Sequence, residues 1–120
     1  STDVCVPISK LSDCIVETVK DLEENDLVGP IASHAGDGNF HVAVMLDLNN
    51  KNEVSKLGPF LDRLSERAIK MDGTCTGEHG IGQGKRKYMY NELGNSVDVM
   101  EAIKKSFDPN LIMNPGKLFI

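Results

Sequence analysis

Three histidines and one glutamate carry most of the chemistry that this sequence offers. His34 and His41 flank one glycine-rich segment, and His79 directly follows Glu78 in a second. Imidazole nitrogens and carboxylate oxygens bind zinc, and a His₂Glu set leaves coordination positions open for a substrate or water. We therefore predict a divalent-metal site formed by His34, His41 and Glu78.

His79 is not needed as a ligand in this set. A neutral imidazole beside a metal can accept a proton from a bound hydroxyl or water, so we predict that His79 is the catalytic base. Each glycine-rich segment alone would be an ordinary surface turn, and exposed histidines are commoner than ligands. The two segments together favour a metal site.

A tight β-hairpin is expected to position the two histidines of the first segment. Asp37-Gly38 favours the positive φ angles of a two-residue turn. Such a turn would place His34 directly opposite His41 on one face of the sheet, with Cβ atoms roughly 5 Å apart. The other face would present apolar side chains to the core, namely Ile31, Phe40, Val42, Val44 and Leu46.

The elements around this hairpin predict an α+β fold. Strands are expected at 3–7, about 28–35, about 40–47 and after Gly73, with one helix before the hairpin and another beginning at Asn49-Asn50. This order is the split β-α-β pattern of a ferredoxin-like antiparallel sheet with two helices on one face. We expect a single domain, 1–120, in which 1–76 form the core and 77–120 form a glycine loop and a C-terminal helical tail.

The tail is expected to contain helices near 85–91 and 95–107. The second of these would turn four apolar side chains inward: Val97, Met100, Ile103 and Phe107. Because the chain opens on Ser1 without an initiator methionine, we expect it to be a piece of a longer protein.

Composition excludes some classes of partner. The 120 residues have a formal net charge of -5 and no long basic run, which argues against nucleic acid. The apolar runs are too short for a membrane-spanning helix. Three cysteines without CxxC spacing favour a reducing compartment, and Cys75 is expected to be a buried free thiol.

Three function classes remain open from the residues alone. One is a metal-assisted oxidoreductase with a second cofactor that accepts hydride. Another is a metal-dependent hydrolase that uses the same His₂Glu site. The third is a non-catalytic ferredoxin-like binding module. The glycines of 80–84 match neither a dinucleotide-binding nor a P-loop motif.

Three motifs in order carry a family resemblance: HAGDGNFH over 34–41, GTCTGEHGIG over 73–82, and NPGK over 114–117. Together they resemble the C-terminal domain of FAD-linked 2-hydroxy-acid dehydrogenases. Within that family the likeness is greatest to the mitochondrial, cytochrome-linked D-lactate branch. The relatives include D-2-hydroxyglutarate dehydrogenases and glycolate oxidase flavin subunits.

The resemblance implies a role for each candidate residue. His34, His41 and Glu78 would hold zinc or manganese, and His79 would remove the hydroxyl proton of the substrate. Asn114 would contact the cofactor or the substrate, because the NPGK turn resembles a segment that lies beside the flavin.

The resemblance also implies partners. FAD would be bound mainly by an N-terminal flavin domain outside this chain, so the chain alone would be inactive. The substrate would be a small 2-hydroxy acid, and Ala43 beside the metal would favour the methyl group of lactate. Electrons would pass to an acceptor such as cytochrome c, and the location would be mitochondrial.

Overall fold

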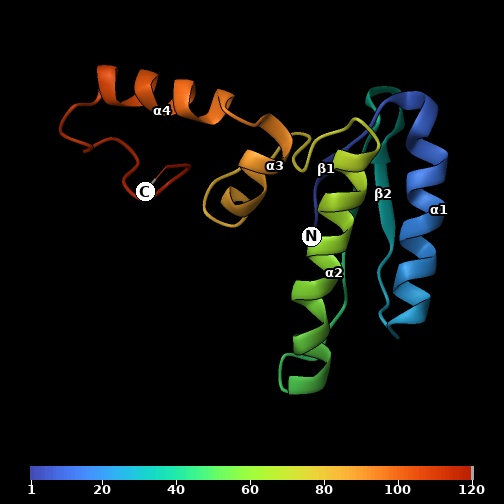
Figure 1. Ribbon diagram of the computed structural model, residues 1–120. Coiled ribbons are helices and arrows are strands. Elements are labelled where there is room, and N and C mark those ends of the chain that lie inside the picture. The colour runs from blue at the N-terminus through green and yellow to red at the C-terminus, as the bar shows by residue number, and fades with distance from the viewer. Residues whose placement is uncertain (120) are drawn as a thin grey trace. The chain divides into compact units, whose positions relative to one another are not determined.

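The computed structural model describes residues 1–119, which belong to two compact units (Figure 1). The first unit, Ser1–His79, contains β1 (Val4–Cys5), α1 (Ile8–Glu24), β2 (Ile31–His34), β3 (Asn39–Val42) and α2 (Lys51–Lys70). The second unit, from Gly80 onward, contains α3 (Met89–Leu93) and α4 (Ser96–Phe107). The predicted α+β class is confirmed. None of the described helices combines the length and the apolar character needed to cross a membrane.

The sheet of the first unit is antiparallel, with the strand order β1-β3-β2. Thr74 pairs with Cys5 through an isolated antiparallel bridge, on the edge of β1 that does not pair with β3. With that bridge counted as the fourth strand, the order becomes that of a ferredoxin-like sheet. The expected strand after Gly73 is reduced to this bridge, and the chain then enters the glycine loop.

Both long helices cover the same face of the sheet. Val4, Phe40 and Val42 are almost completely buried on that face. They share one core with apolar residues of α1 and α2, which are Leu11, Cys14, Leu22, Phe60, Leu64 and Ala68. The opposite face is therefore left for the histidines.

A buried ion pair fastens the two helices to each other. Asp21 of α1 accepts hydrogen bonds from Arg63 and Arg67 of α2, with the shortest contact 2.6 Å from Arg63 Nη2. Burial alone would raise the pKa of Asp21, but the two guanidinium groups hold it below its usual range. Arg67 and Asp21 are both largely buried, at 13% and 7% side-chain exposure, and removing one partner of a pair so buried costs roughly 3–5 kcal/mol.

Helix α2 begins as the sequence predicts. The Asn50 side chain accepts hydrogen bonds from the backbone N–H groups of Asn52 and Glu53, as an N-cap does. Pro59 lies inside this helix, which runs from Lys51 to Lys70 as one element.

The predicted hairpin register is wrong by two residues. His34 pairs with Asn39, not with His41, because the turn spans 35–38 and contains a 3-10 helix. Gly38 lies at φ 74° against the backbone of Val6, where an added Cβ would come within 2.0 Å of the Val6 carbonyl oxygen. This tertiary contact overrides the local preference for a two-residue turn. Because the shift is two residues, every side chain keeps its predicted face.

The predicted inward face of α4 is mostly wrong. Val97 is buried, but Met100, Ile103 and Phe107 are 38%, 54% and 84% exposed. Val97 lies near the start of α4, the end that follows α3 in the chain. The second unit is small, so it has little surface with which to bury the rest of this face.

Candidate metal centre

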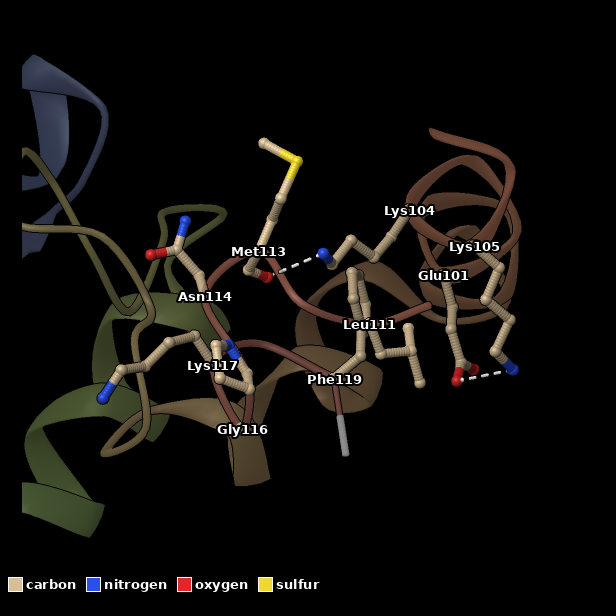
Figure 2. Close-up of a pocket in the computed structure, with 10 residues that line it drawn as sticks. Glu101, Lys104, Lys105, Leu111, Met113, Asn114, Gly116, Lys117 and Phe119 are labelled. Carbon is tan, nitrogen blue, oxygen red and sulfur yellow. Dashed lines mark hydrogen bonds and ion pairs between the residues drawn. The ribbon is translucent and has the colours of Figure 1, made fainter. Parts of the chain in front are cut away.

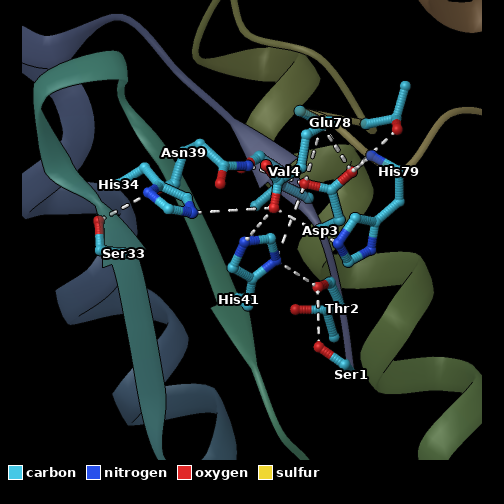
Figure 3. Close-up of polar contacts among 12 residues, drawn as sticks. Ser1, Thr2, Asp3, Val4, Ser33, His34, Asn39, His41, Glu78 and His79 are labelled. Atoms are coloured by element: carbon cyan, nitrogen blue, oxygen red, sulfur yellow. Dashed lines mark hydrogen bonds and ion pairs between the residues drawn. The ribbon is translucent and has the colours of Figure 1, made fainter.

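The structure brings His34, His41 and Glu78 together in the first unit. One ligand atom from each lies within 4.8 Å of the others. Glu78 Oε1 is 3.0 Å from His41 Nε2 and 3.9 Å from His34 Nε2. Figure 3 shows the imidazoles of β2 and β3 and the carboxylate of the glycine loop converging from three segments.

The position of His34 follows from the register. His34 lies opposite Asn39, so His41, two residues farther along β3, is its diagonal neighbour on the same face. Diagonal neighbours lie within reach of long side chains. The two ring centroids are 6.0 Å apart and the rings are nearly perpendicular.

His41 is held in the tautomer that a ligand needs. Its Nδ1 lies 2.9 Å from the carbonyl oxygen of Thr2, which can only accept a hydrogen bond. Nδ1 donates to this carbonyl, so Nε2 is the ring nitrogen that faces Glu78 and can reach a cation there. A second-sphere carbonyl of this kind commonly orients a metal-binding histidine.

His79 lies beside this group but outside the triangle of ligands. Its Nε2 is 3.4 Å from Glu78 Oε1, and its ring stacks on that of His41 with centroids 5.0 Å apart. The side chain of His79 is 53% exposed, whereas that of His41 is 14% exposed. An imidazole with this access can exchange protons with a small molecule at the site.

A buried carboxylate holds the loop that carries Glu78 and His79. Asp3 Oδ2 accepts hydrogen bonds from the backbone N–H groups of Gly77, Glu78 and His79 at 2.9, 3.0 and 2.8 Å. Burial alone would raise the pKa of Asp3, but these N–H groups and the Asn39 amide bring it far below its usual range. Asp3 is therefore ionised at neutral pH.

Asn39 connects Asp3 to the histidine-bearing strand. Its Nδ2 donates to Asp3 Oδ1 at 2.7 Å and to the Val4 carbonyl at 3.0 Å. Its Oδ1 is buried and has no hydrogen-bond partner among the described residues. Figure 3 shows this amide between His34 and the Asp3 carboxylate.

The three donors fit a divalent cation. Tetrahedral ligands about 2.0–2.1 Å from zinc are roughly 3.4 Å apart. The separations of 3.0 and 3.9 Å from Glu78 Oε1 lie on either side of that value, and the three ligand atoms all lie within 4.8 Å of one another. The donor set is also of the right kind, because it combines two imidazoles with one carboxylate.

Asn114 belongs to the second unit. It lies at φ 47° where the 114–117 turn begins, and its backbone carbonyl accepts a hydrogen bond from the N–H of Lys117. Asn114 lines a cavity together with Leu111, Met113, Lys117 and Phe119 (Figure 2). In that view its amide points away from Leu111 and Phe119.

Sequence reasoning missed Asp3, Asn39 and the Thr2 carbonyl. Asp3 stands 74–76 residues before its backbone partners, so no local pattern connects them. The only local signal was the position of these two polar residues beside buried apolar ones, since Asp3 directly precedes Val4 and Asn39 directly precedes Phe40. Buried polar residues usually have hydrogen-bond partners, here Asn39 Nδ2 with Asp3 Oδ1.

The chain belongs to the family of FAD-linked oxidases, as its C-terminal domain. The model of that family matches residues 1–118. The match covers residues of both units. It includes Asn114 and the four residues of the histidine–glutamate cluster, which are His34, His41, Glu78 and His79.

Among curated proteins, the chain is similar to D-lactate dehydrogenases. It is 56% identical over 119 residues to the "Probable D-lactate dehydrogenase, mitochondrial" of Danio rerio, with 98% of this chain and 24% of the relative covered. It is 48% identical to "D-lactate dehydrogenase [cytochrome], mitochondrial" of Arabidopsis thaliana, with 98% and 21% covered. A glycolate oxidase subunit of Bacillus subtilis is 38% identical, with 98% and 25% covered. The chain thus spans about a quarter of the length of these relatives.

Proposed function

We propose that this chain is the metal- and substrate-binding part of a flavin-dependent D-2-hydroxy-acid dehydrogenase that oxidises D-lactate to pyruvate. The observation that carries the proposal is the convergence of His34, His41 and Glu78 beside His79. That convergence occurs in a chain of the FAD-linked oxidase family. Family membership favours an oxidoreductase over the hydrolase and the non-catalytic module.

Each residue of the cluster has a separate task in this proposal. His34 and His41 bind the cation through Nε2, and Glu78 binds it through a carboxylate oxygen while balancing part of its charge. His79 accepts the proton of the substrate hydroxyl at Nε2. The stacking of His79 on His41 keeps that nitrogen beside the ligands.

Two groups supply the chemistry that side chains lack. When bound, a divalent cation such as zinc or manganese lowers the pKa of the substrate hydroxyl, and FAD accepts the hydride from C2. This chain would hold the cation through the three donors named above. Asn114 is our candidate for a contact with the flavin or the substrate, and most of the flavin would be held by an N-terminal domain of the same protein.

The names of the relatives support the substrate and the setting. D-lactate dehydrogenase and glycolate oxidase subunit both denote proteins that act on small 2-hydroxy acids. We propose a mitochondrial location and a cytochrome as the electron acceptor, as the name of the Arabidopsis relative indicates. Ala43 stands two residues after His41, just past the end of β3, and its small side chain would suit the methyl group of lactate.

Metal binding tests the first part of the proposal. Titration of the protein with zinc or manganese chloride in a calorimeter should show one site, and His34→Ala should weaken it more than about tenfold. Equal affinity in both proteins would exclude His34 as a ligand.

Turnover tests the role of His79. In the flavin-loaded enzyme, His79→Ala should lower kcat for D-lactate by about 10²–10⁴-fold, the usual contribution of a general base. The flavin absorption spectrum should stay the same, because the substitution is not expected to disturb the cofactor. Unchanged kcat would assign the base to another group.

A further inference from the structure

We propose that Asp3 is a positioning residue for the metal centre. Its carboxylate fixes the backbone of Gly77–His79 and thereby presents Glu78 and His79 to the histidine-bearing strand. This inference rests on the proposed function, because it assigns Asp3 a task in the same site.

The loop that carries Glu78 and His79 depends on Asp3 for much of its order. Three consecutive backbone N–H groups and the Thr76 hydroxyl donate to the single atom Oδ2. The side chains of Glu78 and His79 are 49% and 53% exposed, so packing restrains them little. The Asp3 side chain is 1% exposed. The buried anion is thus the fixed point, and the exposed loop is arranged around it.

The same short segment also orients His41. The Thr2 carbonyl accepts the hydrogen bond from His41 Nδ1, while Asp3 Oδ1 lies 3.9 Å from that nitrogen. Thr2 and Asp3 therefore act on two proposed ligands that come from different parts of the chain. The orientation of His41 and the placement of Glu78 are set by adjacent residues.

Asn39 closes the connection between the loop and the strand. Its amide nitrogen binds Asp3 Oδ1, and Asn39 itself stands opposite His34 in the sheet. Gly77 packs so closely on this pair that an added Cβ would lie 2.0 Å from Asn39 Nδ2 and 2.8 Å from Asp3 Oδ1. The loop, the first strand and the histidine strand are thus joined at one carboxylate.

The carboxylate of Asp3 suits this position because the hydrogen bonds described above all come from N–H and O–H donors. An asparagine has the same shape, but its NH₂ group would face an N–H group and lose at least one acceptor site. The loop would then move, and the separation between Glu78 and His41 would no longer be fixed. Outer-sphere partners of metal ligands typically change metal affinity by 10–100-fold.

The test compares Asp3→Asn with Asp108→Asn in the full-length protein. Asp108 is also buried and also accepts backbone N–H groups, but its partners are Ile112 and Met113 of the second unit. Titration with zinc chloride and with manganese chloride should give an affinity about 10–100-fold lower for Asp3→Asn. Asp108→Asn should bind the metals as the unmodified protein does. Circular dichroism and thermal unfolding establish that both variants fold.

The outcomes separate this inference from the proposed function. Unchanged affinity in a folded Asp3→Asn variant, or an equal loss in Asp108→Asn, would overturn the role of Asp3 alone. Failure of the unmodified protein to bind either metal would overturn the metal centre itself. Amide hydrogen exchange adds a readout without metal, because Glu78 and His79 should exchange faster in Asp3→Asn and stay unchanged in Asp108→Asn.

If Asp3→Asn does not fold, a milder variant, Thr76→Val, tests the positioning role of Asp3. Thr76→Val keeps the carboxylate and removes one hydroxyl donor from a partly exposed position. Its metal affinity should fall several-fold with little change in thermal unfolding. Affinity equal to that of the unmodified protein would count against the positioning role.

Discussion

Asp3 and Asp108 are two buried aspartates that each bind the backbone of a loop, one over a long and one over a short distance in sequence. Each carboxylate accepts backbone N–H groups of a loop that would otherwise lack partners. Asp108 gathers Ile112 and Met113, four and five residues along the chain, and also pairs with Lys104 one helical turn earlier. Asp3 gathers Gly77, Glu78 and His79, which lie 74–76 residues away.

The difference shows how each region obtains its geometry. The contacts of Asp108 form within a dozen residues and organise the approach to the 114–117 turn. The contacts of Asp3 require that the sheet has formed, because they join the first strand to the segment after α2. The proposed metal centre therefore depends on the fold of the whole first unit, whereas the approach to the turn that carries Asn114 is organised by local contacts.

Glu78→Gln should have the largest effect and sets the scale for this comparison. The substitution keeps the shape of the side chain and removes its charge, so metal affinity should fall more than about 100-fold, beyond the range of an outer-sphere partner. Titration calorimetry with zinc chloride measures this loss. Asp3→Asn should fall between Glu78→Gln and the unmodified protein.

The control for Glu78→Gln is Glu23→Gln, the same change at an exposed position of α1. It should leave metal affinity unchanged. If Glu78→Gln bound zinc as tightly as this control, Glu78 would not be a ligand, and Asp3 would position nothing of importance to the metal.

The same contrast explains what could be predicted from sequence. The donor set and the cap at Asn50 follow from residue type and local spacing, and the structure brings the donors together and places the cap. The contacts of Asp3 have no local signal in the sequence. The hydrogen bonds that position Glu78 could therefore not be predicted.

Two further errors have tertiary causes. The hairpin register depends on the close approach of Gly38 to Val6, which no turn rule contains. The apolar spacing in α4 predicts a face but not what covers it, and Phe107 is exposed within the described residues. Periodicity reports which side chains share a face, while burial depends on the partner surface.

Gly77→Ala should have a smaller effect than Glu78→Gln or Asp3→Asn, because it disturbs the Asp3 contact without changing a polar group. The added methyl group would collide with the Asn39 amide and the Asp3 carboxylate, so the loop must move. We expect metal affinity to fall about tenfold, at the lower end for an outer-sphere change. Calorimetry with manganese chloride provides the measurement.

Gly84→Ala is the matched control for this glycine. A Cβ there meets no heavy atom within 4 Å, and its backbone does not have a positive φ. It should bind metal normally. Equal behaviour of the two variants would mean that the packing of Gly77 on Asp3 and Asn39 does not control the site.

The smallest expected effect is a shift in an acid titration. It tests whether the Asp108 loop responds to pH independently of the Asp3 loop. The hydrogen bond from Lys104 lowers the pKa of Asp108, burial opposes this, and the N–H groups of Met113 and Ile112 lower it further. Because the pKa is lower in the folded protein, the carboxylate stabilises its loop above the usual aspartate value of about 3.9, and this contribution is lost as the pH falls through the folded pKa. Lys104→Met should therefore move the midpoint of the Ile112 and Met113 amide signals upward, toward about 3.9, in an NMR titration. The Glu78 and His79 amides should titrate as before, since their carboxylate is Asp3; if they shifted together with Ile112 and Met113, the two aspartates would not act independently.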